Sequence, residues 1–325
     1  CVFYICLSVN TGSAQTTNYP AGFGIDGNVK VESTLPASAH DDWFKTTTSS
    51  VAGIPLIDTT GAAAIKQHII NLFNTGQLLE YPFIRRMTKP GYTVQNGKLF
   101  LDALFARDYY MSGSGGDRTV MLGSKTKNCA NPMTEWKGGA SGIGSSANDL
   151  VDIYAHARRN GTSITDSLWV MGGLAYMGSG GSHFFDYEFY QSEIAFVDPP
   201  LWSEVGFLNS GNAEGHTDWK FDALGRVIKA GDMIVAISYS NGGVSSVEIR
   251  IWVSELTRNT VLPSNFSWGT EFDKIQVSRL YGYASIEIPA GALSYSINTV
   301  ATPAGPWATV DGDGAPVSDN HKEYA

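Results

Sequence analysis

The sequence predicts an all-β dominated protein, a β-sandwich or jelly roll with one short α-helix near residues 61–74. After Pro90, short runs rich in β-branched and aromatic residues alternate with turns of Gly, Asn and Asp, which is the pattern of antiparallel sandwiches. Charged residues make up 16% of the 325 residues, well below the usual proportion of about a quarter, and 36 glycines supply turns. This composition is typical of an extracellular β protein.

The N-terminus has the features of an export signal. An apolar run at residues 2–9 is too short to span a bilayer and is followed by small polar residues. Gly12 and Ala14 occupy the −3 and −1 positions of a signal-peptidase site. We therefore expect residues 1–14 to be the remnant of a secretory signal peptide and the mature chain to begin at Gln15. A buried N-terminal strand is the alternative.

Residues 15–94 are predicted to form an extended lobe that carries the helix. In residues 61–74, Ile65, Ile69 and Leu72 recur at helical spacing. The residues that follow, "NTG", end the run.

Residues 95–300 are predicted to form one β-sandwich domain, because no Pro- or Ser-rich linker divides them. The run "DLVDIYAHARR" alternates between an apolar face and a face with polar groups, as a strand does. "SNGG" at residues 240–243 separates two strand-like runs and predicts a hairpin, since Asn and Gly tolerate positive φ. Residues 301–325 are expected to be the start of a truncated continuation into further domains of the same polypeptide.

The first candidate site lies in the strand-like run "FFDYEFYQ". Asp186, Glu188 and Tyr190 share one face of this strand. Residues two apart on a strand lie roughly 6.5–7 Å apart, near the separation of glycosidase carboxylates, roughly 5–5.5 Å or 6.5–9.5 Å. Jelly-roll glucanases carry a third acid at the position that Tyr190 occupies here. Three interpretations remain open: a catalytic pair, a ligand or cation contact, and the polar side of a sandwich wall whose aromatic side packs in the core.

A second candidate site is the segment "GHTDWKFD", in which His216 and Trp219 are candidate ligand-binding residues. Aromatic side chains on strands stack on sugars in binding modules, although core packing is the more common use of such residues. None of the common metal, nucleotide or nucleophile motifs (HExxH, CxxC, GxSxG, GxGxxG, P-loop) occurs in the chain.

A third candidate site is an acidic turn near the C-terminus, "TVDGDGAPVSDN". Asp311, Asp313 and Asp319 lie around glycines, and calcium prefers clustered carboxylates on such turns. The spacing does not match an EF-hand, so a solvated acidic turn is the alternative. Asn148, Asp149 and Asp152 form a similar cluster. No cofactor other than this calcium is expected.

Charge and cysteine content restrict the partners. The net charge is −9 without a Lys/Arg cluster, and nucleic acid is not expected because phosphate neutralisation needs clustered basic residues. An extracellular polysaccharide or a surface protein is the expected partner, and the mature chain is expected to have no membrane span. Outside the predicted signal, Cys129 is the one cysteine and has no internal disulfide partner.

Several short segments of the sequence are similar to those of a known group of proteins. "HDDWF", "GIPLIDTTGAAA", "SLWVMGGL", "FFDYEFYQ", "GHTDWKFDALGRVIKAGD" and "VEIRIWV" occur in this order between Asp41 and Val253. Together they resemble a region near the N-terminus of large secreted surface proteins of Bacteroidota, which continue into arrays of sandwich domains and a sorting domain for type IX secretion. The resemblance implies export to the cell surface and an adhesin-like role, and it implies no active-site residue.

The sequence therefore predicts a secreted, non-catalytic β-sandwich module of a large adhesin-like cell-surface protein. A carbohydrate-binding jelly roll is the alternative, and a polysaccharide hydrolase using Asp186 and Glu188 is a further one.

Overall fold

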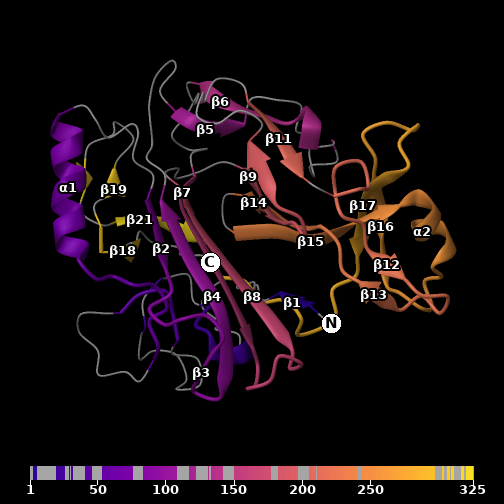
Figure 1. Cartoon of the computed structure of the whole chain (residues 1–325), viewed down its shortest axis with the longest axis horizontal. Helices are drawn as coiled ribbons and strands as arrows, with labels where there is room; N and C mark the ends of the chain where they lie inside the picture. The colour runs from indigo at the N-terminus through magenta and orange to yellow at the C-terminus, as the bar shows by residue number, and fades with distance from the viewer. Residues whose placement is uncertain are drawn as a thin grey trace. The chain divides into compact units, whose positions relative to one another are not determined.

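The computed structural model has mostly antiparallel β-structure (Figure 1). It describes residues 3–5, 20–25, 29, 31, 41–45, 53–75, 83–107, 117–121, 131, 133–141, 150–176, 182–196, 205–209, 211–240, 243–296, 302–303, 306–307, 309–310, 316–317 and 320–324.

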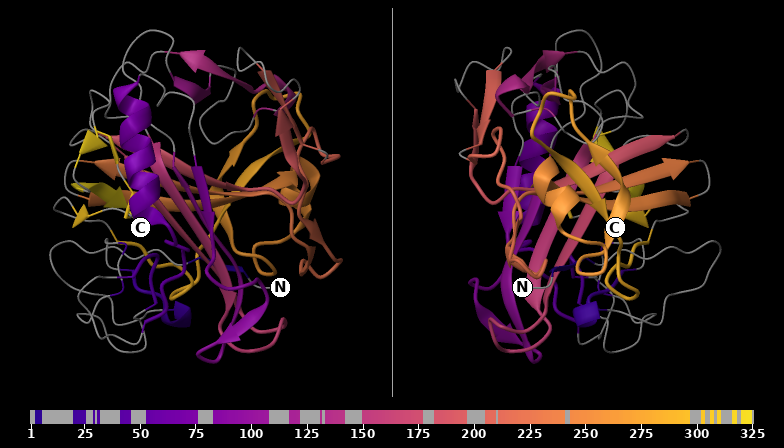
Figure 2. Two further views of the ribbon diagram at one scale, coloured as in Figure 1. Left: turned by 60° about the vertical axis from the view of Figure 1, so that its left-hand side comes forward. Right: turned by 90° about the vertical axis from the view of Figure 1, so that its right-hand side faces the viewer.

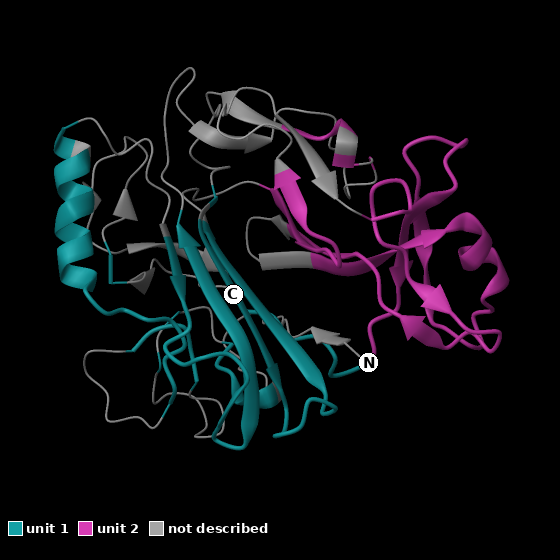
Figure 3. Ribbon diagram, in the orientation of Figure 1, with its two compact units in different colours: residues 1–113, 143–180, 290–325 teal, residues 114–142, 181–289 magenta. Residues whose placement is uncertain are grey.

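The chain divides into two compact units whose segments interleave in sequence (Figure 3). Unit 1 consists of residues 1–113, 143–180 and 290–325, and unit 2 of residues 114–142 and 181–289. The predicted single domain at 95–300 is thus divided between the units, and the predicted lobe at 15–94 belongs to unit 1. The chain leaves unit 1 and returns to it, so no single linker marks the boundary in the sequence.

Unit 1 is built on a sheet of eight described strands in the order β18-β21-β8-β7-β4-β2, with β1 paired to β8 and β3 to β4. The long strands β4, β7 and β8 run side by side (Figure 2). The strands of this sheet are β1 (Phe3–Ile5), β2 (Phe83–Arg86), β3 (Thr93–Gln95), β4 (Lys98–Arg107), β7 (Leu150–Arg159), β8 (Leu168–Tyr176), β18 (Thr302–Pro303) and β21 (Asn320–Tyr324). A short pair, β19 (Thr309–Val310) and β20 (Pro316–Val317), and a 3-10 turn, Pro20–Gly22, complete the described elements together with the helix α1.

The helix α1 (Ala62–Asn74) confirms the predicted helix. Ile69 is fully buried, and Ile65 and Leu72 pack against the core of unit 1, as the helical spacing requires. That core also contains aromatic rings from the segment before the helix and from β4 and β7, namely Phe23, Trp43, Phe44, Phe100, Phe105 and Tyr154.

The strand β7 buries the face that carries its polar groups. Asp152, Tyr154, His156 and Arg158 are all buried, whereas Ile153 on the other face is exposed. Alternation in a half-solvated antiparallel strand ordinarily places the apolar residues inside. Here the polar groups are buried because their partners are buried with them: Arg107 forms two hydrogen bonds to Asp152, and Arg158 bonds Asp41.

Unit 2 contains a sheet of five described strands in the order β16-β17-β15-β14-β9. Its strands are β9 (His183–Phe189), β14 (Met233–Ser240), β15 (Gly243–Ser254), β16 (Trp268–Asp273) and β17 (Tyr281–Ile286). The strands β14 and β15 pair antiparallel with Ser240 opposite Gly243, which confirms the predicted hairpin. A second sheet and a small hairpin contain β5 (Asp117–Met121), β6 (Lys137–Ser141), β10 (Ile194–Phe196), β11 (Val205–Asn209), β12 (Lys220–Phe221) and β13 (Val227–Lys229), and a 3-10 turn covers Met133–Glu135.

The predicted fold class is confirmed: the described part of the chain consists mostly of strands in antiparallel sheets with only two α-helices, as in an all-β, sandwich-like fold. A second helix, α2 (Glu255–Thr260), escaped the sequence analysis. It is only six residues long, and Ser254 caps it by accepting a hydrogen bond from the Thr257 N–H.

Both ends of the described chain join the sheet of unit 1. Within the predicted signal segment, β1 pairs in parallel with β8, the placement that the alternative interpretation expects. Within the predicted continuation, β21 pairs antiparallel with β8. Among the described residues, no helix is long and apolar enough to cross a membrane.

Candidate functional site

The predicted carboxylate pair lies on one face of β9, β14 and β15, and the strand register defines its neighbours. The register aligns three rows across the three strands, and we call them together the Asp186 face. The rows are Phe184–Ser238–Ser246, Asp186–Ala236–Glu248 and Glu188–Ile234–Arg250.

Exposure changes from one end of the Asp186 face to the other. Phe184 is 69% exposed, and Asp186 and Ser246 are also exposed. In the third row, Ile234 is fully buried and Arg250 nearly so. The first two rows therefore form an open end, and the third row leads into a closed end.

The closed end is centred on His216, whose side chain is 0% exposed. Aromatic rings surround the imidazole: the ring centroid of Trp252 lies 4.1 Å away, that of Tyr283 5.6 Å and that of Tyr190 6.1 Å. Trp136, beside the 3-10 turn Met133–Glu135, packs into the same cluster. His216 is therefore a core residue.

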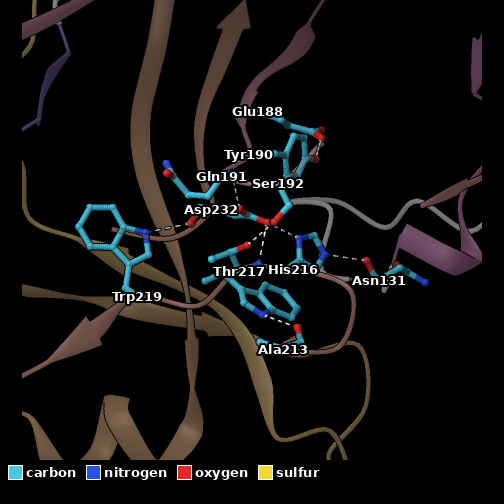
Figure 4. Close-up of polar contacts among 11 residues, drawn as sticks. Asn131, Glu188, Tyr190, Gln191, Ser192, Ala213, His216, Thr217, Trp219 and Asp232 are labelled. Atoms are coloured by element: carbon cyan, nitrogen blue, oxygen red, sulfur yellow. Dashed lines mark hydrogen bonds and ion pairs between the residues drawn. The ribbon is translucent and has the colours of Figure 1, made fainter. Parts of the chain in front are cut away.

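Asp232 connects the parts of the closed end (Figure 4). Its carboxylate accepts hydrogen bonds from the backbone N–H groups of Gln191, at 2.8 Å, and Thr217, at 3.0 Å. Its backbone carbonyl accepts from the Trp219 indole at 3.0 Å. Gly231 precedes it because a Cβ at that position would lie 2.3 Å from the Thr217 carbonyl oxygen.

The imidazole of His216 faces an oxygen at each ring nitrogen. Nδ1 lies 3.3 Å from the Asp232 carboxylate, and Nε2 lies 3.3 Å from the Asn131 carbonyl oxygen. Both oxygens are acceptors, and which of them receives the N–H of the imidazole depends on the tautomer. His216 therefore links the segment at Asn131 to Asp232, which directly precedes β14.

Asp186 and Glu188 lie in different surroundings. Asp186 is exposed in the open end, whereas the half-buried Glu188 accepts a hydrogen bond from the Tyr190 hydroxyl. The ring of Tyr190 also stacks on His216, so Glu188 is attached to the edge of the core. On the other side of the strand, Phe185 and Phe189 are half-buried, and Phe189 lies opposite the buried Met233 of β14.

The structure thus brings four of the five predicted ligand-binding residues into one connected group. Glu188, Tyr190 and His216 form a chain of contacts, and Trp219 reaches it through Asp232, while Asp186 lies one row away. Trp219 is only 7% exposed, so it has a structural position and offers no exposed ring for stacking.

Of the residues predicted at the two acidic clusters, the structure describes only Asp152. Asp311, Asp313 and Asp319 lie outside the described residues, as do Asn148, Asp149 and Cys129. Asp152 is fully buried and paired with Arg107. In the described part of the chain, no three His, Cys, Asp or Glu residues are placed to hold a metal ion.

The sequence analysis did not name Asp232, Phe184 or Glu248 as site residues, although Phe184 falls on the same strand face as Asp186 by alternation. The run "VEIRIWV" shows the alternation of Glu248 and Arg250, but only the strand register shows that they share a face with Asp186. The glycine before Asp232 is the one local signal of a close backbone approach.

Comparisons with known proteins gave no match with a protein-family model, a curated protein or a solved structure. The function is therefore argued from the geometry of this chain.

Proposed function

We propose that the chain is a secreted, non-catalytic β-sandwich module of a large adhesin-like cell-surface protein. The observation that carries the non-catalytic part of the proposal is the burial of His216 at 0% side-chain exposure between Asp232 and the Asn131 carbonyl. A general acid or base has to come within about 2.6–3.2 Å of its substrate, directly or through one water. An imidazole enclosed by four aromatic rings does not reach one.

The state of the carboxylate pair supports the same conclusion. Glu188 accepts a hydrogen bond from the Tyr190 hydroxyl, and the other residues of its row, Ile234 and Arg250, are buried. Glu248, the third carboxylate of the face, is bonded to Arg250 at 2.7 Å. These contacts fix Glu188 and Glu248 as structural parts of the sheet, and the open end of the face remains for binding.

Catalysis is tested by incubating the full chain with soluble polysaccharides and measuring the release of reducing ends. We expect no release above that of a heat-denatured sample. Hydrolysis by the native chain that Glu188→Gln abolishes and Glu271→Gln leaves unchanged would overturn the non-catalytic assignment, because Glu271 is exposed on β16 at the opposite edge of the same sheet.

Export is tested in the producing cell. We expect externally added protease to remove the protein from intact cells, and we expect N-terminal sequencing of the mature form to begin at or near Gln15. A protein that is protected until the cells are lysed contradicts the surface role.

A further inference from the structure

We propose that the open end of the Asp186 face binds a neutral polysaccharide, with the ring of Phe184 stacked against a sugar and Asp186 accepting hydrogen bonds from its hydroxyl groups. This inference rests on the proposed function, because it names the ligand of the binding module and the residues that contact it.

Phe184 is the first element of the site. Among the large apolar side chains that the described residues of unit 2 expose, it is the one aromatic ring, at 69% exposure. The adjacent Phe185 points to the other side of the strand and is half-buried, so the sequence "FF" places one ring inside and one outside. An exposed ring fixed on a strand presents a flat apolar surface, and the C–H groups of a pyranose face match it.

The neighbours of Phe184 supply polar groups at fixed spacing. Asp186 follows in the next row of the same strand, and Ser246 lies two strands away in the row of Phe184. Two rows and three strands cover about 7 by 10 Å, from the rise along a strand and the spacing between strands. This area fits a short stretch of a sugar chain.

The side chain at the centre of the second row is small. Ala236 lies between Asp186 and Glu248 in the second row, and its methyl group is the smallest side chain of the three. Ala236 is partly buried against the core cluster of the closed end, so a sugar ring stacked on Phe184 would lie over the outer part of the face with Asp186 at its edge. Hydroxyl groups that donate to a carboxylate form charge-assisted hydrogen bonds, which are stronger than neutral ones.

The charge of the face selects against acidic sugars. Asp186 and Glu248 bring two carboxylates, and the nearest cation on the face, Arg250, is bonded to Glu248 and Asp273. The guanidinium of Arg250 thereby orients Glu248 and acts as a positioning residue. A net charge of −9 for the chain adds to the repulsion of an anionic polymer.

The closed end keeps the open end in a fixed geometry. The Asp232 carboxylate accepts from the Gln191 N–H directly after the end of β9, and β14 pairs with β9 along its whole length. A face that is ordered before binding loses less conformational entropy when the ligand arrives.

The test is affinity electrophoresis of the full chain in native gels that contain a neutral polysaccharide: hydroxyethyl cellulose, xyloglucan, galactomannan or dextran in separate gels. We expect retardation in at least one of them. Phe184→Ala is expected to lower the affinity about tenfold or more, as loss of a central aromatic contact does. Asp186→Asn is expected to lower it several-fold.

Two matched variants serve as controls. Leu256→Ala removes an apolar side chain of α2 with 72% exposure, and Glu271→Gln removes an exposed carboxylate from the far edge of the sheet. Both are expected to bind as the native chain does, and circular dichroism of every variant confirms that the β-structure is intact. Retardation should also persist in about 0.5 M NaCl, because a neutral ligand is not subject to ionic screening.

Three results would overturn the inference. Equal retardation of Phe184→Ala and the native chain would place the site elsewhere, and retardation that disappears in high salt would indicate a charged partner. No retardation in any gel would reject the polysaccharide as ligand. If the protein is then still accessible to protease on the cell and hydrolyses nothing, the adhesin-like module stands with a protein partner. Hydrolysis of the gel polymer would instead refute the proposed function.

Discussion

The two sheets bury ionised groups in different ways. In unit 1, the Asp152 carboxylate on β7 is bonded by the guanidinium of Arg107 on β4 at 2.6 and 2.7 Å, and both side chains are 0% exposed. In unit 2, the Asp232 carboxylate is bonded by two backbone N–H groups and faces His216. The Asp152 carboxylate is satisfied by a side-chain partner, whereas the Asp232 carboxylate is satisfied by backbone N–H groups of neighbouring segments.

This difference shows what each buried charge does for its unit. The ion pairs of unit 1 join strands and segments to each other: Arg158 on β7 holds Asp41, which lies 117 residues earlier in the chain. Asp232 instead fixes two turns of its own unit, at Gln191 and Thr217, next to the Asp186 face. The ion pairs of Arg107 and Arg158 join segments of unit 1, whereas Asp232 of unit 2 shapes a surface.

The largest expected effect comes from breaking the buried pair of unit 1. Arg107→Met leaves the Asp152 carboxylate without its two guanidinium bonds, and removal of one partner of a buried pair costs about 3–5 kcal/mol. Urea denaturation followed by circular dichroism measures the change in the free energy of unfolding. The double variant Arg107→Met, Asp152→Leu should recover most of the loss, and an equal loss in both variants would show that packing, rather than charge, is responsible.

Acid is expected to weaken unit 1 through His156. Burial, together with the charge of Arg158, lowers the pKa of His156 from 6.5 to about 3, although its hydrogen bond to the Asp102 carbonyl oxygen opposes the shift. Below pH 6.5 the unfolded chain therefore binds a proton that the folded chain does not. The contribution of neutral His156 to the free energy of unfolding is complete above pH 6.5. It falls by up to about 1.4 kcal/mol per pH unit below that, or about 2–3 kcal/mol by pH 4.5.

The measurement is urea denaturation of the native chain and His156→Asn at several values of pH between 7 and about 4.5. Asn can keep a donor toward the Asp102 carbonyl oxygen without titrating. The native chain should lose stability faster than the variant as the pH falls. Parallel pH profiles would mean that His156 takes up no proton on unfolding.

A smaller loss is expected from Asp232→Asn in unit 2. Each oxygen of the Asp232 carboxylate accepts from one backbone N–H, that of Gln191 or that of Thr217. The amide of Asn has only one oxygen, so its NH2 group would face the other N–H donor. We expect a loss of about 2 kcal/mol, the range for hydrogen bonds to a charged group. Weaker glycan retardation that accompanies this loss would confirm that Asp232 shapes the Asp186 face, and an unchanged stability would contradict its role as an anchor.

The smallest effect is expected at the exposed pair of Arg86 and Asp102, whose side chains are 65% and 61% exposed and lie 3.1 Å apart. Arg86→Ala should change the free energy of unfolding by less than about 1 kcal/mol, because solvent screens such pairs. It is the surface counterpart of Arg107→Met in the same sheet. A loss as large as that of the buried pair would mean that solvent exposure does not distinguish them.

The sequence predicted what local pattern determines. Alternation located β7, the spacing of Ile65, Ile69 and Leu72 located α1, and "SNGG" located the hairpin of β14 and β15. Each of these signals lies within a few residues along the chain, where backbone geometry and side-chain period act directly. The predicted strand "FFDYEFYQ" ends at Phe189, and the Gln191 N–H beyond it donates to the Asp232 carboxylate.

For this protein, the sequence alone determined the all-β class, the positions of the long strands and the one long helix. Tertiary structure decided which face of β7 is buried, which residues share a face with Asp186, and that His216 is a core residue. The reason is physical: an ionised side chain is buried only where a partner neutralises it, and here those partners lie 45 and 117 residues away. Pairing across such distances depends on the sheet register, which no local pattern encodes.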